Sequence, residues 1–572
     1  MKITEIISMV EDQAQDDILK VLKGFIACGY DLDMKSMGNL ALSLENNGLA
    51  TWQMDEDLAL ISYINTWCSR FHQKYQNFSP SEFCSCMFTF SVKDIEVLKD
   101  KTEEEIRSRL CLIKGLNGLV CSYIAPMVNF DSKQGLSKEL SQFKSFLLTT
   151  WKVDMLRSIL NATTEKSDDE PPIITITLDP IANIHKGTDD IATTWFYQSF
   201  VIVTQNPSSS LCISSPTSED PQFPLLIKLS GEDVQGNSGS FRHFLNRIIV
   251  ELHSTSIPIL MPYMGNGPLK GMFILRPAAA GGSSSHQQQI LTQKFLEYFG
   301  QIIGMAVRSR IPLPLGIAPI FWKCLANESI TDQDVIHVDP DLEVYLNELE
   351  TASSNPEVFE AFLEHHQYPA FAHHSITGEE AELCPGGKNM ALTYENCMDY
   401  VKKMRRFRRR EIVCKDQIAS IVTGLSTILP WRFIEGFFTG DELQALVCGA
   451  EDTDLHILKK HTIYQVGLSE DDRHIQDFWQ ILFSLNSKQK KMFIKFACNQ
   501  ERIPLPDYGE DLPPPFPMKI APADSRDETQ DNLLIRAETC IFMLKIPRYS
   551  TYDVMKEKLI YSIFSADDPL SG

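Results

Sequence analysis

Residues 533–550 of the chain read LLIRAETCIFMLKIPRYS. In this segment Phe542, Leu544 and Ile546 alternate along the chain, which is typical of a strand with one buried face, and a proline then ends it. Cys540 is therefore predicted to lie where a polar loop enters a strand. Such a position suits a nucleophile, because the sheet fixes the side chain while the loop leaves it accessible. On this local pattern alone, the alternative that Cys540 is a small buried apolar residue stays open.

A helix is predicted to follow the strand. Ser550 is the expected N-cap, with Asp553 three residues later. Apolar residues then recur at helical spacing and are expected to face the core. They are Tyr552, Met555, Leu559 and Ile563.

The composition bounds the class of protein. At 572 residues the chain is too long for one simple core, so three or four domains are expected. An apolar content of 43% is typical of a packed globular protein. The net charge of −22 disfavours general nucleic-acid binding, which relies on Lys and Arg to neutralise phosphates.

We expect a cytoplasmic or nuclear protein without membrane insertion. The N-terminal residues become acidic too early for a secretory signal. The most apolar stretch, residues 295–307, is interrupted by Glu297 and is too short for a membrane span. The 14 cysteines are then expected to stay reduced.

Residues 1–170 are predicted to be helical because they contain two apolar stripes at helical spacing. The pair Cys84 and Cys86 has no second pair at zinc-site spacing, and we interpret it as structural. The acidic, proline-ended residues 165–172 are predicted to form a linker. The stripes are Leu60, Ile64 and Trp67, and then Ile106, Leu110, Ile113 and Leu116.

Seven residues of the segment 533–550 match a longer signature. They are Leu534, Ala537, Thr539, Cys540, Leu544, Pro547 and Tyr549. In these residues the segment resembles the end of a HECT-type E3 ubiquitin ligase domain, which reads roughly Leu-Pro-x-Ala-x-Thr-Cys-Phe and then Leu-x-Leu-Pro-x-Tyr. Ile535 replaces the proline of this signature, and Ile541 replaces its phenylalanine.

Further matches to this family run in order along the chain. A strand at 173–178 and a second one at 226–233 lead into a glycine turn. A phosphate-binding loop is excluded there, because no Gly-Lys-Ser/Thr follows. A long helix is expected next, whose Gly300 and Gly304 allow close packing. The matching residues include Gly236, Gly239, Arg242 and Phe244, the helix face Leu291, Phe295, Phe299 and Ile303, and later Thr393, Glu395, Asn396, Tyr400, Val401, Pro430, Glu442 and Leu443.

The resemblance implies an α+β fold. A helical region at 1–170, with a role open between substrate binding and bracing, is followed by a bilobal HECT-like domain. Its mostly helical N-lobe is expected at 171–466, with a subdomain at about 326–440 that binds the E2 ubiquitin-conjugating enzyme. A small α/β C-lobe is expected at 467–572. The hinge between the lobes is expected at Gln465, Val466, Gly467 and Leu468.

The resemblance also implies two acyl transfers at Cys540. Its thiolate attacks the thioester between ubiquitin and the E2, and a substrate lysine then attacks the ubiquitin–Cys540 thioester. The implied partners are ubiquitin, an E2 and a protein substrate, without a cofactor or a metal. Thr539 is expected to help place the nucleophile. Glu538, which stands where many relatives carry histidine, is expected to orient or deprotonate the lysine.

Two features of the middle of the chain each allow two interpretations. Leu342, Leu346 and Leu349 form an apolar stripe, which is either a core face or, by the resemblance, part of the groove that binds the E2. The helix around 398–410 carries many basic residues, which suit a solvated face or contact with an acidic partner, nucleic acid or a nuclear import receptor. A metal site is not predicted, because no ligand spacing appears among the nearby histidines. These are His365, His366, His373 and His374.

Two rival functions stay open. A cysteine protease or deubiquitinase would pair Cys540 with a histidine, and His474 is the nearest one upstream, although no matching motif surrounds it. A catalytically weak or inactive HECT-like scaffold is the second rival. It is favoured by Ile535, Ile541 and the tail, where Pro569 takes a position at which relatives often carry phenylalanine. Leu570 and Phe564 are the candidates to replace that phenylalanine.

Relatives of this type often carry substrate-binding modules far upstream. The chain is therefore expected to correspond either to the C-terminal piece or to a short form of a larger ligase.

Overall fold

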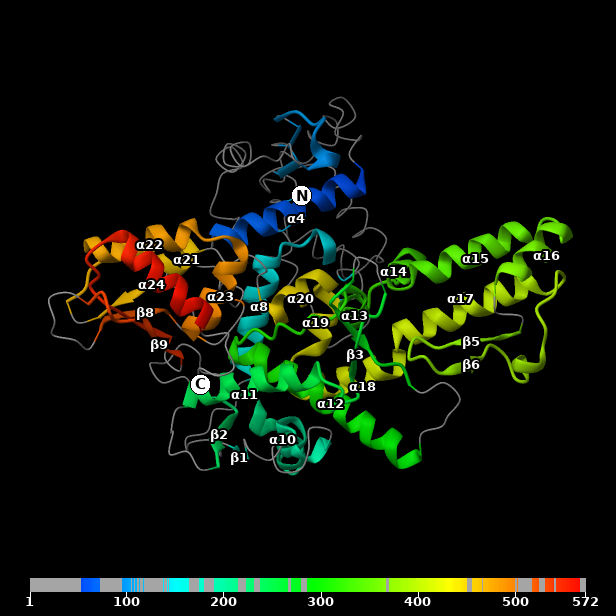
Figure 1. The fold of residues 1–572 in the computed structure, drawn as a ribbon, viewed down its shortest axis with the longest axis horizontal. Helices are drawn as coiled ribbons and strands as arrows, with labels where there is room; N and C mark the ends of the chain where they lie inside the picture. Colours follow the sequence, from blue (N-terminus) through cyan, green and yellow to red (C-terminus); the bar gives the residue numbers. More distant parts are fainter. Residues whose placement is uncertain are drawn as a thin grey trace, which may run out of the picture.

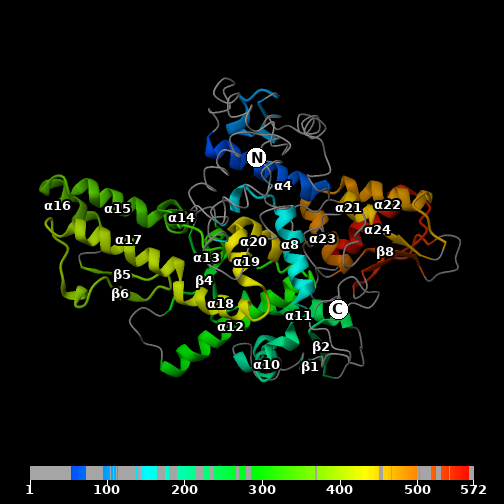
Figure 2. The same cartoon turned by 180° about the vertical axis from the view of Figure 1, so that it is seen from behind.

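A computed structural model gives the fold of the chain, and its described parts form three units (Figure 1). We call them the central unit, the arm (residues 332–413) and the C-terminal lobe (residues 455–565). The arm and the C-terminal lobe lie on opposite sides of the central unit, as the reverse view also shows (Figure 2). The structure describes residues 53–71, 95–103, 105–106, 109–110, 113, 117, 137, 141, 144–163, 174–179, 190–213, 223–230, 237–265, 269–278, 285–366, 370–449, 455–465, 467–498, 502, 517–523, 530–539 and 542–565.

The central unit is mainly helical and carries two small sheets. The strands β1 and β2 pair in parallel, whereas β3 and β4 pair antiparallel. Its elements are α4 (Met54–Phe71), α8 (Thr149–Ala162), β1 (Ile174–Leu178), α10 (Trp195–Val203), β2 (Leu225–Leu229), α11 (Asn237–Leu252), β3 (Leu260–Pro262), β4 (Phe273–Leu275), α12 (His286–Ser309), α13 (Pro319–Leu325), α18 (Lys415–Ser426), α19 (Trp431–Phe437) and α20 (Gly440–Cys448).

The long helix α12 runs through the core of the central unit. A capping box fixes its N-terminus: Ser285 Oγ accepts the backbone N–H of Gln288, and the Gln288 side chain accepts the backbone N–H of Ser285. Leu291, near this end, is exposed. The rest of the predicted apolar face is buried, which confirms the helix and most of its orientation. The buried residues of that face are Phe295, Phe299 and Ile303.

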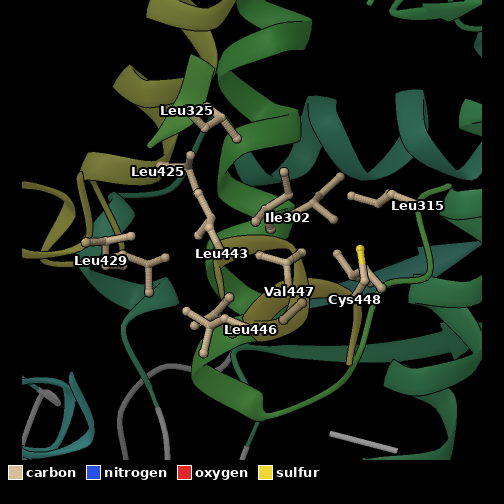
Figure 3. Packing of buried hydrophobic residues seen from close by; sticks show 14 of the residues in the cluster. Ile302, Leu315, Leu325, Leu425, Leu429, Leu443, Leu446, Val447 and Cys448 are labelled. Atoms are coloured by element: carbon tan, nitrogen blue, oxygen red, sulfur yellow. The ribbon is translucent and has the colours of Figure 1, made fainter. Parts of the chain in front are cut away.

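Glycines allow α12 and α18 to approach at backbone distance. A Cβ atom on Gly300 would lie 2.2 Å from the carbonyl oxygen of Ile421, and one on Gly424 would lie 1.8 Å from that of Glu297. The close packing predicted for Gly300 is therefore confirmed. Figure 3 shows the core beside this contact, where side chains of α12, α13, α18 and α20 meet.

We expect Gly300→Ala to lower the free energy of unfolding by about 2–3 kcal/mol, because the new methyl group would collide with backbone that cannot move alone. The control is Gly436→Ala in α19, where the nearest atom to the new Cβ is the Cβ of Ser141 at 4.0 Å. This control should leave stability unchanged or raise it slightly, since alanine favours a helix. Urea unfolding of the three proteins compares them, and equal midpoints would contradict the close approach.

The described parts of residues 1–170 share the core of the central unit instead of forming a region of their own. Helices α4 and α8 contribute to the same hydrophobic cluster as α12 and α18. A buried ion pair joins α8 to α20, with 2.6 Å between Lys152 Nζ and Glu442 Oε2. The predicted stripes are buried except for Leu116, which lies outside the described residues. The buried members are Leu60, Ile64, Trp67, Ile106, Leu110 and Ile113.

The arm is a helical projection with a separate core. Its helices α15, α16 and α17 pack around a buried cluster, and a short antiparallel pair of strands closes one side. Its elements are α14 (Asp332–Val338), α15 (Pro340–Ala352), α16 (Pro356–His365), β5 (Ala372–His374), β6 (Glu380–Glu382) and α17 (Cys397–Val413).

The C-terminal lobe is a small α/β unit with a four-stranded sheet in the order β7-β8-β10-β9. The strand β10 runs parallel to β8 and antiparallel to β9. Together with the helical central unit, this sheet confirms the predicted α+β fold. The elements of the lobe are α21 (Leu455–Lys460), β7 (Ile463–Tyr464), α22 (Arg473–Ser484), α23 (Ser487–Cys498), β8 (Lys519–Pro522), β9 (Arg536–Glu538), β10 (Met543–Ile546) and α24 (Tyr552–Ser565).

The lobe begins earlier than the predicted boundary at residue 467. Leu455 and Leu458 of α21 belong to its core cluster, and β7 is the edge strand of its sheet. Residues 455–465 therefore pack with the C-terminal lobe, because their apolar side chains and backbone groups find their partners there.

Candidate active site

The strands β9 and β10 pair antiparallel, and Cys540 lies between them in the sequence. Met543 lies opposite Glu538 in this pairing, so residues 539–542 connect the two strands. Cys540 and Ile541 lie outside the described residues, and their flanks on both sides are described. Whether the cysteine stands at the junction of loop and strand therefore stays a prediction.

The end of the turn is anchored in the core of the lobe. The backbone N–H of Phe542 donates to the carbonyl oxygen of Thr539 at 3.4 Å. Phe542 has a φ of +50°, which is rare for a bulky residue and costs about 1–3 kcal/mol. Its buried ring belongs to the core cluster of the lobe. Packing of this ring holds the backbone in that conformation, directly after the segment that carries Cys540.

The strand after the turn is the best-supported part of the sheet. The strand β10 lies between β8 and β9, and its side chains Leu544 and Ile546 are fully buried, as predicted. Beneath them, the predicted helix α24 buries Met555, Leu559 and Ile563. The turn is therefore attached to a rigid strand, which is the arrangement that a positioned nucleophile requires.

The predicted N-cap of α24 is wrong by one residue. The hydroxyl of Thr551 accepts the backbone N–H of Val554 at 3.3 Å, which makes Thr551 the cap. Ser550 instead binds Asp531: its N–H and its hydroxyl donate to the two carboxylate oxygens at 2.8 and 2.6 Å. These bonds hold the segment that leads into β9 against the segment that follows β10.

Glu538 lies at the end of β9 and pairs with a cation on the neighbouring strand. Its Oε1 atom is 2.9 Å from Lys545 Nζ, and 43% of its side chain is exposed. The carboxylate thus already binds one ammonium group beside the turn. It remains accessible from solvent, so a second amine can approach it.

Arg242 of α11 connects the central unit to the turn. Its Nη2 donates to the carbonyl oxygen of Thr539 at 2.8 Å, although the two residues are 297 positions apart. The side chain of Arg242 is only 2% exposed. The sequence marks Arg242 as a motif residue without indicating this contact. A signal was present, since Phe241 and Phe244 on either side predict a buried surface that a charged residue enters only with partners.

His474 lies in the first turn of α22 and interacts electrostatically with Arg548, which follows β10. Burial lowers the pKa of His474, and the charged groups that act on it are Asp472, Arg548 and Asp477. Arg548 follows Ile546, whereas Cys540 precedes the first residue of this strand, and four strand residues span about 10 Å. The described geometry therefore gives no support to a Cys540–His474 pair of the protease type.

The predicted stripe Leu342, Leu346 and Leu349 is a core face. All three side chains are buried in the cluster of the arm, where α16 and α17 cover them. A groove of about 670 Å³ lies next to them between α15 and α16. The large apolar residues that are exposed at this groove are Val344, at 57%, and Val358, at 46%. A periodic stripe did not reveal them, because they stand outside it.

The predicted hinge residues that are described belong to the C-terminal lobe. The N–H of Gln465 donates to the carbonyl oxygen of Ile520 on β8 at 2.9 Å, and Leu468 is buried in the core of the lobe. Gly467 has a φ of +73°, a conformation that glycine adopts without strain. Val466 lies outside the described residues, as do residues 450–454, which connect α20 to α21.

The histidines of the arm do not converge. Nδ1 of His365 lies 2.9 Å from the carbonyl oxygen of Ala361, and His366 Nε2 lies 3.3 Å from Glu348 Oε2. Among the described residues, no three His, Cys, Asp or Glu side chains are grouped so that they could hold a metal ion. Cys84 and Cys86 lie outside the described residues.

The basic face of α17 is partly neutralised within the arm. Arg405 binds Glu343 and Glu350 at 2.7 Å each, and Arg408 lies 2.8 Å from Asp339. Lys403 pairs with Asp399, and Arg409 lies 3.0 Å from Asp332. The other three cations of this helix are exposed. They are Lys402, Arg406 and Arg410.

The positions that depart from the family signature differ in their surroundings. Ile535 is buried in the core of the lobe, so an apolar side chain fills the place of the usual proline. Phe564 of α24 is exposed. Ile541, Pro569 and Leu570 lie outside the described residues. None of the helices that the structure describes has the length and apolar character that a bilayer span requires.

Comparison with known proteins agrees with this architecture. The profile of the family described as HECT-domain (ubiquitin-transferase) matches residues 268–568, more than half of the chain. The human protein named "Probable E3 ubiquitin-protein ligase HECTD4" is 32% identical over 98% of this chain. Human "E3 ubiquitin-protein ligase HERC2" is 26% identical over 80% of it. "E3 ubiquitin-protein ligase RSP5" of Chaetomium thermophilum is 27% identical over 61% of it.

The chain corresponds to only part of these relatives. It spans 14% of the length of the HECTD4 protein, 9% of that of the HERC2 protein and 40% of that of the RSP5 protein.

Proposed function

This chain belongs to the HECT-domain (ubiquitin-transferase) family, and on this premise we propose that it is an E3 ubiquitin-protein ligase that works through a thioester on Cys540. The observation that carries the proposal is the turn between β9 and β10. Thr539 and Phe542 hold its two ends, one against the central unit and one in the core of the lobe. These two contacts on either side of Cys540 support the proposal that the scaffold positions it.

The proposed chemistry needs only a thiolate and an amine. The Cys540 thiolate attacks the carbonyl carbon of the ubiquitin–E2 thioester, one C–S bond forms, and the E2 thiolate leaves. A substrate lysine then attacks the new thioester, a C–N bond forms, Cys540 leaves as thiolate, and the amine loses a proton. Both steps suit cysteine, because a thiolate is a good nucleophile and a good leaving group near neutral pH. The proposed role of Glu538 is to attract the lysine, and it is supported by the ammonium group of Lys545 that its accessible carboxylate binds.

The first transfer requires the C-terminal lobe to move. By the family resemblance we place the E2 on the arm, which lies on the opposite side of the central unit from the lobe (Figures 1 and 2). The movement would occur between α20, which ends at Cys448, and α21, where the C-terminal lobe begins at Leu455. Such gating steps are common where two bound groups must be brought together.

The activity is tested by incubating the protein with ubiquitin, activating enzyme, ATP and each member of a panel of E2 enzymes. Ubiquitin conjugates that survive reducing gels, formed only with certain E2 enzymes and only when the protein is present, are the expected result. Their absence with every E2, for a protein that is folded by circular dichroism, would favour the alternative of an inactive HECT-like scaffold.

Charging the groove of the arm should weaken the interaction with the E2. We expect Val344→Asp or Val358→Asp to raise the E2 concentration needed for half-maximal loading about 10- to 100-fold, since a carboxylate would be buried on binding. Met264→Asp, which charges a residue that is exposed elsewhere in the central unit, should leave loading unchanged. Titration of the E2 in a loading assay measures this, and equal curves for all variants would place the E2 on another surface.

A further inference from the structure

We propose that Arg242 is a positioning residue for the second transfer, from Cys540 to the substrate lysine. By binding the carbonyl oxygen of Thr539, it locks the C-terminal lobe onto the central unit with the Cys540 turn in place. This inference rests on the proposed ligase function. It assigns the second transfer to the arrangement of the lobe and the central unit in which Arg242 binds Thr539.

The contact has the properties of a specific lock. The Arg242 side chain is almost fully buried, and burial of a guanidinium is costly unless polar groups receive its N–H donors. One of these donors meets Thr539 O at 2.8 Å, across the boundary between two units with separate cores. Hydrogen bonds from a charged donor are stronger than neutral ones. Figure 1 shows α11 on the side of the central unit that faces the lobe.

The acceptor is the backbone of the turn itself. Thr539 immediately precedes Cys540, and its carbonyl oxygen also accepts the N–H of Phe542. The carbonyl is therefore held from inside the turn and from the central unit at the same time. Fixing this carbonyl restricts the backbone of the turn from the residue directly before Cys540. The proposal is that this restriction narrows the directions in which a thioester on Cys540 is presented.

The lock belongs to the second step because of where the lobe lies. With Arg242 bound to Thr539, the turn is against α11, whereas the arm extends from the opposite side of the central unit (Figures 1 and 2). Loading from an E2 on the arm requires the lobe to leave this position and the hydrogen bond to break. After loading, the bond can form again and hold the thioester while the lysine attacks.

The test separates the two steps by single turnover. Arg242→Met removes the donors, and Arg242→Lys keeps the charge without the fork that reaches the carbonyl. The control is Arg247→Met on the same helix, whose side chain is 40% exposed and pairs with Glu251. Labelled ubiquitin is loaded from the E2, loading is stopped, and free lysine is added to discharge the thioester.

We expect Arg242→Met to load within about twofold of wild type and to discharge to lysine about 10- to 100-fold more slowly. Arg242→Lys should fall between the two, and Arg247→Met should match wild type in both steps. Unchanged discharge in Arg242→Met overturns the proposal. Loading and discharge that fall by the same factor, with a lowered melting temperature, also overturn it, because they would show a merely structural role.

Hydrogen exchange gives a second readout that does not depend on activity. The amide of Phe542 should exchange at least about tenfold faster in Arg242→Met than in wild type or Arg247→Met. A wild-type protein that forms no thioester would refute the ligase function. The exchange rate of the Phe542 amide would still show whether Arg242 holds the turn. Equal exchange in all three proteins would show that Arg242 does not hold the turn.

Discussion

Replacement of Cys540 by alanine is expected to abolish ubiquitin conjugation, with a loss on the order of a thousandfold or more. Both proposed steps require the sulfur atom of this residue. The substitution should therefore stop the reaction, and not merely weaken E2 binding or slow one of the two steps. The substitution removes only one atom from a turn whose ends are held by Arg242 and by the ring of Phe542. The fold should therefore be retained, and the melting temperature should stay within a few degrees of wild type.

The matched control is Cys384→Ala, which removes a partly exposed thiol from the arm. It should conjugate ubiquitin at the wild-type rate. Conjugation that persists in Cys540→Ala would exclude a covalent mechanism at this residue. Equal losses in both variants would indicate a general requirement for thiols and not a nucleophile in the turn.

Replacement of Lys152 by methionine is expected to lower the free energy of unfolding by about 3–5 kcal/mol. Lys152 Nζ is fully buried and donates to Glu442 Oε2 and to the carbonyl oxygen of Lys144, both at 2.6 Å. Without it, the carboxylate of Glu442 would remain in a protein interior without its cation. Such an uncompensated charge is the most expensive outcome of breaking a buried pair.

The double variant Lys152→Met with Glu442→Gln separates the ion pair from simple packing. Glutamine still completes the capping box with Thr439 at the start of α20, since it offers the same acceptor at the same length. The double variant should therefore recover at least about 1–2 kcal/mol relative to Lys152→Met. Urea unfolding measures the three proteins. A loss below about 1 kcal/mol in Lys152→Met would contradict the buried pair that joins α8 to α20.

Local patterns predicted the elements next to the site well. The alternation of Leu544 and Ile546 and the helical spacing of Met555 and Leu559 both correspond to buried faces. These patterns are reliable because each element must bury one side, whatever it packs against. The cap of α24 was misplaced by one residue because Ser550 binds Asp531, which lies 19 positions upstream. A capping rule that considers only neighbouring residues cannot predict a partner so far along the chain.

Long-range contacts explain most of what the sequence did not reveal. The pairs Arg242–Thr539 and Lys152–Glu442 join residues almost 300 positions apart, so no spacing rule links them. The first makes an N-lobe motif residue part of the candidate site. The second places helix α8, which the sequence assigned to an N-terminal region of unknown role, in the core of the central unit.

Apolar stripes show a different limit. A core face and a binding groove both require apolar residues at helical spacing, so the stripe that contains Leu346 fitted either. The structure buries Leu346 and exposes Val344 instead. Only the packing of α16 against α15 shows which residues of α15 are buried and which line the groove. That packing depends on the turn between the two helices, whose direction the sequence did not specify.

The most direct test of the account is detection of the ubiquitin adduct on non-reducing gels after a short pulse with a charged E2. Wild type should form one adduct that dithiothreitol removes, and Cys540→Ser should form an adduct at the same residue that resists dithiothreitol, because an oxygen ester does not exchange with thiols. An adduct in Cys540→Ala, or none in wild type with any E2, would contradict the claim that Cys540 carries ubiquitin.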